Sequence, residues 1–492
     1  MLFNSLQFLI FFPVVTVLYF ALPQKYRNLM LLAASTIFYM AFVPAYILIL
    51  ATLIAIDYIC GILIENSPVQ KKRRYLLLSI AATCLMLFVF KYFNFFVNNV
   101  SFAAHLLHVN CSPPVLNILL PLGLSFHTFQ SLSYIIEVYK GKQKAERNLL
   151  IYALYVMFYP QLVAGPIERP QNLLKQFYEE HTIDYVRITN GLKLMTYGLF
   201  KKVVVADRLA AFVDAAYISP QQHAGVPMII AAIFFSFQIF CDFSGYTDIA
   251  LGSAEVMGFR LMQNFRQPYF SRSISEFWKR WHISLTSWLR DYIYNYLTYR
   301  ALHKKKCTQT TLHFNVILVF LICGLWHGAN WTYIVFGFLH GFYIVTGDIT
   351  RKLRKTFVNA LGLSKLTVVH KVWQISVVFT LVTFSLIIFR SKNLSEAFFI
   401  IKTLFINIEN ITNLKYMKSL FEMPQFKLSD LIISVLSILL IESIHFFQTR
   451  YNITNWFAAK PLCFRWSFYY AGILTIIFLG VFNNNRFIYF AF

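Results

Sequence analysis

Long apolar runs recur along this chain and are separated by short polar segments. Runs such as 76–90 and 431–441 are continuously apolar and do not alternate with polar residues. A helix needs about 20 mostly apolar residues to cross a bilayer, and it satisfies its own backbone hydrogen bonds there. A membrane β-barrel would instead show short alternating strands. The pattern therefore predicts an all-α, polytopic integral membrane protein.

The apolar runs predict the individual membrane segments. Some of the shorter ones are expected to be re-entrant or interfacial, and no repeat or soluble linker divides the chain, so one membrane domain should cover residues 1–492. The predicted segments are 6–22, 28–42, 44–64, 75–96, 115–136, 149–163, 191–217, 226–251, 312–325, 331–345, 372–389, 428–445 and 468–482.

Composition supports a lipid environment. Of the 492 residues, 58% are hydrophobic and only 13% are charged, about half the charged share of soluble domains. The seven cysteines are scattered without a CxxC pair, so neither a zinc site nor a disulfide framework is expected. The apolar stretch 2–22 lacks a basic leader and a cleavage site, and we expect it to be a retained first span.

Charge gives the expected orientation. The formal net charge of +23 lies in short clusters between apolar runs, as in cytoplasmic loops facing lipid head groups, and not on a nucleic-acid-binding domain. The clusters within 71–74, 140–147, 300–306 and 351–355 should be cytoplasmic. Loops 101–114, 219–225 and 408–425 should lie outside, together with the N-terminus.

The segment 264–299 breaks the pattern of simple spans. Its aromatic and apolar residues recur at spacings of three and four, which predicts one amphipathic helix along the cytoplasmic interface. Ser275 or Ser273, followed by Glu276, would cap its start. A peripheral anchor without chemistry is one interpretation, and His282 within the helix favours a functional one. The predicted stripe is Trp278, Trp281, Leu285, Trp288 and Tyr292.

A histidine stands in the apolar segment 323–337, CGLWHGANWTYIVFG. An ionisable residue at that depth is costly, so His327 should face the protein interior or a water-filled passage. It is either a functional group or a packed neutral histidine. Gly324 and Gly328 would permit close approach of a ligand or of another helix. His340 should be packed within its span, and the spacing of His282, His327 and His340 does not support a metal site.

Two further segments carry polar residues. Residues 236–252, SFQIFCDFSGYTDIALG, place Asp242, Tyr246 and Asp248 in an apolar run. The carboxylates could orient a histidine, pair with a basic residue, line a channel or mark a broken helix. Residues 161–170, QLVAGPIERP, predict a kinked loop. Its Glu168 and Arg169 could contact a cofactor phosphate, contact each other, or form part of a structural turn.

Several long motifs, in order along the chain, resemble the membrane-bound O-acyltransferase family, in particular its bacterial alginate O-acetyltransferase-like branch. Beyond residue 294 the chain departs from the pattern, with NYLTYRALHKKK where similar proteins often have Ile-Pro-Leu-Gly-Gly. That departure bears on local loop contacts and on the identity of the partner. The motifs are PLGLSFHTFQSLSYIIEVYKG, FYPQLVAGPIERP, KKVVVAD, the segment 237–294, GLWHGANWTYIVFGFLHG and the terminal FIYFAF.

The resemblance implies a ring of about 11–14 transmembrane and re-entrant helices, each sized by the bilayer, with an interfacial amphipathic helix. His327 matches the family's essential histidine, and His282 matches the second signature position, which makes both candidate catalytic residues. Asp242, Asp248, Tyr246 and Trp326 would support them.

The implied activity is acyl transfer, in which neutral His327 would take a proton from an attacking hydroxyl. Acetyl-CoA would be the donor, with Arg280 and Arg290 attracting its phosphates from the cytoplasm. The acceptor would be an alginate-like exopolysaccharide or peptidoglycan, reached with a separate extracytoplasmic acetyltransferase across a bacterial inner membrane. D-alanyl transfer from a carrier protein, a transporter without chemistry and a scaffold for polysaccharide export are the alternatives.

Overall fold

The computed structural model describes residues 1–109, 113–118, 120–163, 165–421, 426–451, 453–482 and 487–488. The elements of regular secondary structure in these residues are all helices, which confirms the predicted fold class. Parts of two loops expected outside, 110–112 and 422–425, and the last four residues of the terminal FIYFAF motif lie outside the described residues.

Eight helices among the described residues are long and apolar enough to cross a membrane, and α1 (Leu6–Ala21) is apolar but shorter. The chain is therefore a multi-span membrane protein. The eight are α3 (Tyr46–Asn66), the rod Val69–Leu106 made of α4 and α5, α11 (Val226–Met257), α15 (Gln309–His327), α16 (Trp331–Ile349), α18 (Thr367–Arg390), α21 (Leu428–Gln448) and α23 (Leu462–Leu479).

Some predicted boundaries move for local reasons. Helix α6 (Leu124–Tyr139) begins later than predicted because Pro121 and Gly123 precede it, and Gly123 has a left-handed φ of 77°. Helix α7 (Leu149–Met157) ends earlier than predicted, just before Pro160. The mixed segment predicted at 191–217 is a rod of α9 (Tyr185–Leu199), a π-helical turn and α10 (Asp207–Ile218).

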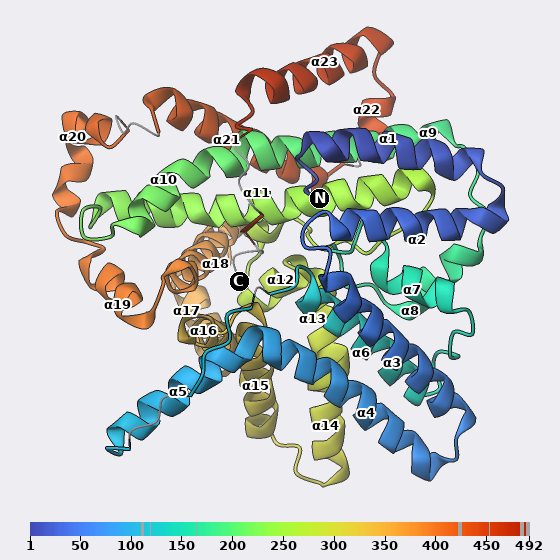
Figure 1. Ribbon diagram of the computed structural model, residues 1–492. Helices are drawn as coiled ribbons and strands as arrows, with labels where there is room; N and C mark the ends of the chain where they lie inside the picture. The colour runs from blue at the N-terminus through green and yellow to red at the C-terminus, as the bar shows by residue number, and fades with distance from the viewer. Residues whose placement is uncertain are drawn as a thin grey trace.

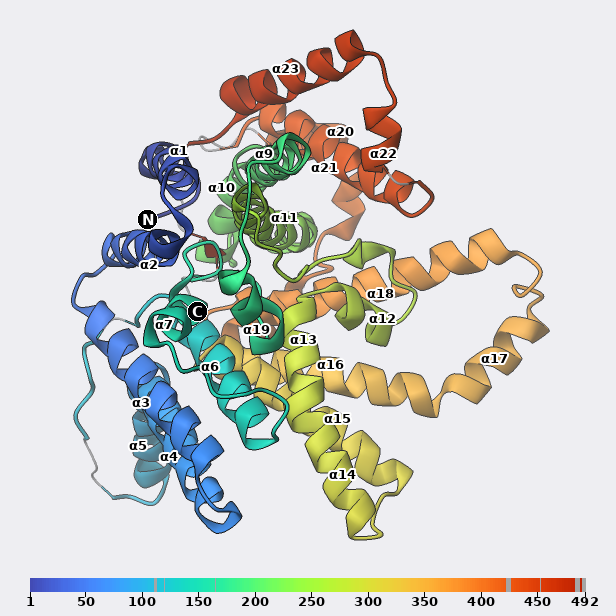
Figure 2. The same ribbon diagram turned by 90° about the vertical axis from the view of Figure 1, so that its right-hand side faces the viewer.

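The long helices surround a smaller group of short ones. The rod of α9 and α10 lies along α11, while α3, α4 and α6 form a second group and α15, α16 and α18 a third (Figures 1 and 2). Helix α13 (Ile283–Leu289) lies near the middle in both views.

Glycines bring some of these helices into close contact. A Cβ added at Gly198 would lie 2.5 Å from the Gly245 carbonyl oxygen, and one added at Gly191 would lie 2.7 Å from that of Gly252. Helices α9 and α11 therefore touch backbone to backbone. Gly324 similarly lies against α16, with its Cα near Gly337, which confirms tight helix packing as a role for that glycine.

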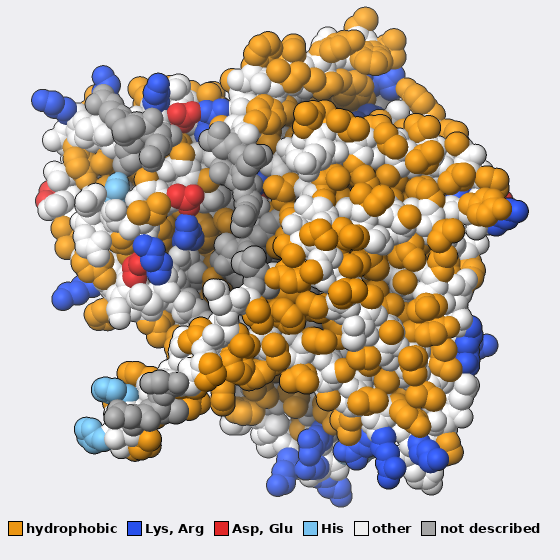
Figure 3. Space-filling view, in the orientation of Figure 1, with side chains coloured by type: hydrophobic (Ala, Val, Ile, Leu, Met, Phe, Trp, Pro, Cys, Tyr) orange, Lys and Arg blue, Asp and Glu red, His pale blue; other side chains and the backbone are white. Residues whose placement is uncertain are grey.

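The surface is divided by polarity. Hydrophobic side chains cover most of the right-hand part of Figure 3, while Lys and Arg gather at its lower edge, where Figure 1 places the α3–α4 turn and the end of α14. The far end of α5, the α10–α11 turn, α19 (Leu394–Thr403) and α20 (Leu414–Ser419) gather on the left. The described parts of the three loops expected outside thus lie on one side of the molecule.

The predicted continuous helix in 264–299 is wrong. The chain breaks at His282, whose φ of 45° and ψ of 53° are left-handed, between α12 (Ile274–Arg280) and α13. Asn264 stabilises the break because its carbonyl oxygen accepts from the Ile283 N–H at 2.9 Å and its side chain accepts from Ser284. A π-helical turn and α14 (Asn295–His303) then extend α13.

The amphipathic character of this segment is nevertheless confirmed. Trp278, Trp281 and Trp288 are buried, while Lys279 and Arg290 are exposed. Ser273 is the residue that caps α12, accepting from the Glu276 N–H at 3.1 Å. The spacing of three and four residues therefore identified the buried face correctly. It could not predict the break at His282, because that break depends on a contact with Asn264 earlier in the chain.

Candidate active site

His327 is the last residue of α15, at the tip of the α15–α16 hairpin. Gly328 is extended and ends α15, and Asn330 starts α16 by accepting from the Thr332 N–H. The His327 side chain is buried, with 4% of the residue exposed. Its ring lies 5.0 Å from Trp326, 5.4 Å from Phe389 and 6.1 Å from Phe336, measured between centroids.

His282 reaches the same place from the break between α12 and α13, and it is fully buried. Phe243 meets its ring edge-on at 4.7 Å, and Phe126 stacks at 6.3 Å. The Trp326 ring lies 5.8 Å from His282 as well as against His327. The structure therefore brings three predicted site residues together around one indole ring.

A cavity of about 50 Å³ opens beside His327. The end of α15, the start of α6 and the residues just before α6 form its wall. The residues before α6 follow the loop 101–114, which is expected outside. The lining residues include Lys91, Gly123, Ser125, Trp326 and His327.

Sequence reasoning missed Lys91 in this wall. It lies in a π-helical turn, Phe88–Tyr92, between α4 and α5. Its ammonium donates to the carbonyl oxygens of Trp326 at 2.6 Å and His327 at 3.2 Å, and to the Ser125 hydroxyl at 3.2 Å. The available signal was a lysine inside an otherwise apolar span, because such residues usually have a function.

His340 has a structural role, as predicted. The Trp278 indole N–H donates to its Nδ1 at 3.1 Å. Nε2 must then carry the proton of the neutral ring and donate to Ser385 Oγ at 2.9 Å, since that hydroxyl donates to the Val382 carbonyl at 2.7 Å. Both ring nitrogens of His340 therefore form hydrogen bonds with neighbouring side chains, as in a structural histidine.

The predicted carboxylates pair with lysines, which was one of the open alternatives. Asp242 lies 2.7 Å from the Lys202 ammonium, and Asp248 lies 2.5 Å from that of Lys201. Asp242 also accepts from the Ile488 N–H at 2.7 Å. The alternative in which they orient a histidine is therefore not the one that the structure shows.

Tyr246 belongs to the same region and not to the histidine pair. Its ring stacks on Phe487 at 4.7 Å and on Phe3 at 4.5 Å. Phe487 is also 5.8 Å from Phe243, which contacts His282. Asp242 and these aromatic rings thus hold Phe487 and Ile488 against Phe243, which contacts His282.

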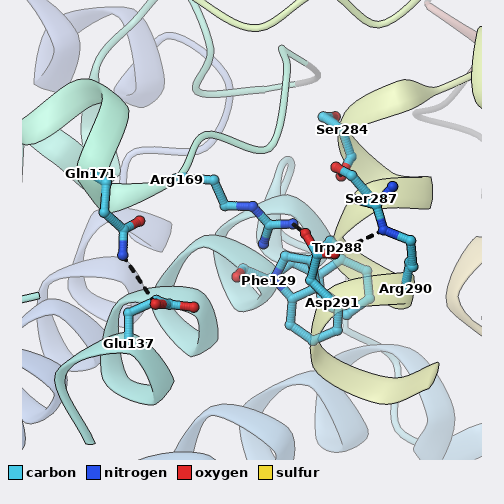
Figure 4. Close-up of polar contacts among 9 residues, drawn as sticks. All are labelled: Phe129, Glu137, Arg169, Gln171, Ser284, Ser287, Trp288, Arg290 and Asp291. Atoms are coloured by element: carbon cyan, nitrogen blue, oxygen red, sulfur yellow. Dashed lines mark hydrogen bonds and ion pairs between the residues drawn. The ribbon is translucent and has the colours of Figure 1, made fainter. Parts of the chain in front are cut away.

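Polar side chains gather at the other end of the site (Figure 4). Asp291 lies between two guanidinium groups, 3.3 Å from Arg169 and 2.8 Å from Arg290. Arg169 and Lys140 also lie over the Tyr292 ring, at 4.6 Å and 5.1 Å. We call Lys140, Arg169 and Arg290 the basic cluster.

Of the two predicted phosphate-binding arginines, only Arg290 is in this cluster. Arg280 pairs with Glu276 at 2.6 Å and reaches the Gln267 carbonyl. The structure therefore separates the two, because the break at His282 sends α12 and α13 in different directions (Figure 1).

Stacked aromatic rings join the basic cluster to the histidines. Phe129 stacks on Trp326 at 5.5 Å and on Trp288 at 4.1 Å, and Trp288 lies 5.0 Å from Tyr292. The Trp288 indole N–H also donates to the Phe129 carbonyl at 2.8 Å. The histidine pair therefore lies between the cavity and the basic cluster.

Glu168 forms part of a structural turn. It is fully buried, and its carboxylate accepts from the Met262 N–H and from Asn172 at 2.6 Å. Burial raises the pKa of the Glu168 carboxyl to about 7, and the two donors oppose that shift. Arg169 points away from it, toward Asp291.

Residues 142–389 match the model of MBOAT, the membrane-bound O-acyltransferase family. The chain belongs to this family. It is 38% identical to the probable alginate O-acetylase AlgI of Pseudomonas aeruginosa, over 82% of this chain and 75% of that protein. It is 30% identical to the peptidoglycan O-acetyltransferase of Helicobacter pylori, over 100% and 98%.

A third relative acts on another class of acyl group. The teichoic acid D-alanyltransferase of Streptococcus thermophilus is 31% identical over 50% of this chain and 61% of that protein. Membership of the family confirms the resemblance and makes this MBOAT protein an O-acyltransferase. The transporter and export-scaffold alternatives lose their support accordingly.

Proposed function

We propose that this O-acyltransferase moves acetyl groups from acetyl-CoA in the cytoplasm to hydroxyl groups of a polysaccharide outside a bacterial inner membrane. The observation that carries the proposal is the position of His327 and His282. Both histidine rings contact the Trp326 ring. They lie between a cavity on the side expected outside and a basic cluster on the side expected in the cytoplasm.

The basic cluster fits the phosphates of coenzyme A. Arg169 and Arg290 present planar guanidinium groups, which bind phosphate oxygens in pairs, and the Asp291 carboxylate lies between them. Lys140 adds a third cation over Tyr292. Arg280 is left out because Glu276 neutralises it elsewhere.

His327 is proposed as the general base. The acceptor oxygen attacks the thioester carbonyl carbon as His327 takes the hydroxyl proton. The carbon–sulfur bond then breaks, and the same proton passes to the departing sulfur. A base must be neutral before the reaction, and we propose that the His327 imidazole is neutral at that point. His282, whose ring lies 5.8 Å from that of Trp326, is proposed to position the reacting carbonyl.

The nature of the acceptor rests on the relatives. The names of AlgI and of the Helicobacter pylori protein indicate alginate and peptidoglycan as their substrates. An exopolysaccharide or peptidoglycan is thus the proposed acceptor here, and a separate extracytoplasmic acetyltransferase is the proposed partner that completes the transfer.

D-alanyl transfer is the second candidate. It is favoured by the similarity to teichoic acid D-alanyltransferases, although over only half of the chain. In that case the thioester would be presented by a carrier protein, and free acetyl-CoA would not be consumed.

The test uses purified protein in lipid with acetyl-CoA labelled in the acetyl group, with and without envelope fractions of the source cells. We expect label to leave coenzyme A with wild type and not with His327→Ala. The labelled fraction would identify the acceptor. Consumption of a D-alanyl carrier thioester without consumption of acetyl-CoA would replace the proposed donor.

A further inference from the structure

The cavity beside His327 holds a cation without a carboxylate. Lys91 lies in the wall with its ammonium 2.6 Å from the Trp326 carbonyl oxygen. Among the described residues, no carboxylate pairs with Lys91, whereas Lys201 and Lys202 each have one. A buried lysine without a carboxylate partner inside a span is costly, so it calls for a function.

Lys91 itself has no donor to spare. An ammonium has three N–H groups, and these are used by Trp326, His327 and Ser125. Ser125 Oγ therefore accepts from Lys91 and keeps its own proton for donation. None of the described residues accepts a hydrogen bond from that hydroxyl, and Ser125 is only 9% exposed and lines the cavity.

The start of α6 adds to the positive potential. Gly123, with its left-handed φ, is the N-cap, and Ser125 is the second residue of this 16-residue helix. The N-terminal end of a helix carries partial positive charge. Ser125, Lys91 and this helix end thus face the same small space as His327.

We propose that Ser125 donates a hydrogen bond to the oxyanion of acyl transfer and that Lys91 positions and polarises the Ser125 hydroxyl. This rests on the proposed function. When the acceptor oxygen bonds to the thioester carbonyl carbon, the carbonyl π electrons move to its oxygen, which becomes negative. They return when the carbon–sulfur bond breaks. A donor aimed at that oxygen stabilises the transition state more than the substrate.

The alternative is that Lys91 only caps the C-terminal carbonyls of α15. The two roles predict different results for Ser125→Ala, since this change removes the hydroxyl and leaves both contacts of Lys91 with the α15 carbonyls in place. Ser133→Ala is the matched control. It lies on the same helix, is fully buried and donates to the Gln130 carbonyl at 2.7 Å, away from the cavity.

The experiment measures label transfer from acetyl-CoA and, separately, binding of a non-reactive thioether analogue of acetyl-CoA. Ser125→Ala should lower the transfer rate roughly 100-fold, the usual effect of losing one oxyanion donor, with analogue binding unchanged. Ser133→Ala should match wild type. Lys91→Met should also lower the rate, and the double variant should be no slower than Lys91→Met alone, because the two act as a unit.

A transfer rate of Ser125→Ala within about twofold of the wild-type rate would overturn the proposal, because the loss of one oxyanion donor lowers the rate much more than that. Equal loss of transfer and analogue binding would overturn it as well, since that result indicates displaced structure. If wild type itself transfers no acetyl label, the proposed donor fails, and the same variants are measured with the D-alanyl carrier thioester.

Discussion

At the scale of residues, the molecule contains two kinds of buried histidine. His340 has both ring nitrogens bonded by Trp278 and Ser385. His327 lies instead at a cavity, among aromatic rings and next to Lys91. Their different surroundings predict different consequences of mutation.

We expect His340→Ala to destabilise the fold, because the buried Trp278 N–H and Ser385 lose their partner, at a cost of roughly 1–3 kcal/mol per unsatisfied group. His327→Ala should leave the melting temperature in detergent close to that of wild type and abolish transfer. Thermal unfolding followed by size-exclusion chromatography measures the first, and label transfer the second. A His327→Ala protein that unfolds while His340→Ala remains stable would reverse the assignment.

The sequence identified His327, His282 and Trp326 correctly as neighbours through the family motifs. Lys91 could have been singled out as a lysine inside an apolar span, but its contact with Trp326 could not be predicted, since it joins two helix groups. The sequence could not choose between the alternatives for Asp242 and Asp248 either. Their lysine partners lie in the KKVVVAD motif, about 40 residues before the carboxylates, and the sequence does not show that the two segments pack together.

At the scale of elements, the contact between α9 and α11 depends on glycine. A Cβ at Gly245 would lie 2.7 Å from the Gly198 carbonyl oxygen, which is too close for any side chain. Gly472, in α23, has no heavy atom within 4 Å of such a Cβ.

Gly245→Val should therefore separate α9 from α11 and destabilise the protein by about 3 kcal/mol or more, the upper range for overpacking. Gly472→Val is the control and should be tolerated. Melting temperature and the yield of monodisperse protein in detergent measure both. Equal stability of the two variants would show that the helices are not in contact as described.

A second prediction concerns the C-terminal segment. Asp242 accepts from the Ile488 N–H, and Phe487 is 2% exposed. Asp242→Ala removes the acceptor, while Lys202 keeps Asp207 as a partner at 2.8 Å.

Carboxypeptidase should then remove Ile488 and Phe487 from Asp242→Ala and leave both residues in wild type, as intact mass would show. Asp214→Ala, whose carboxylate pairs with Arg390 far along the chain, is the control. Equal trimming of wild type and Asp242→Ala would contradict the anchoring role of Asp242.

Element boundaries show where sequence reasoning fails and why. Long apolar helices such as α16 and α18 were located closely, because lipid requires an uninterrupted apolar helix. The break at His282 was missed, since its left-handed backbone is stabilised by Asn264 and leaves the aromatic period intact. Helical periodicity alone cannot reveal a break that preserves the buried face.

At the scale of the whole molecule, the orientation in the membrane is a prediction from the basic clusters. The basic turn between α3 and α4 and the end of α14 lie at one edge, and the α10–α11 turn lies on another side (Figures 1 and 3).

Sidedness can be measured with a membrane-impermeant maleimide on intact cells. Gln222→Cys, in the α10–α11 turn, should label from outside. The native Cys307, beside the Lys304–Lys306 cluster, should label only after the membrane is opened. Labelling of Cys307 in intact cells, with Gln222→Cys protected, would invert the orientation.

The central claim is acetyl transfer from one side of the membrane to the other at His327. Proteoliposomes selected for one orientation, with labelled acetyl-CoA supplied only on the side of the basic cluster and the hydroxyl acceptor only on the opposite side, test it directly. The account predicts labelled acceptor with wild type and with Ser133→Ala, and none with His327→Ala. Labelled acceptor at an undiminished rate with His327→Ala, or only when donor and acceptor share one side, would contradict it.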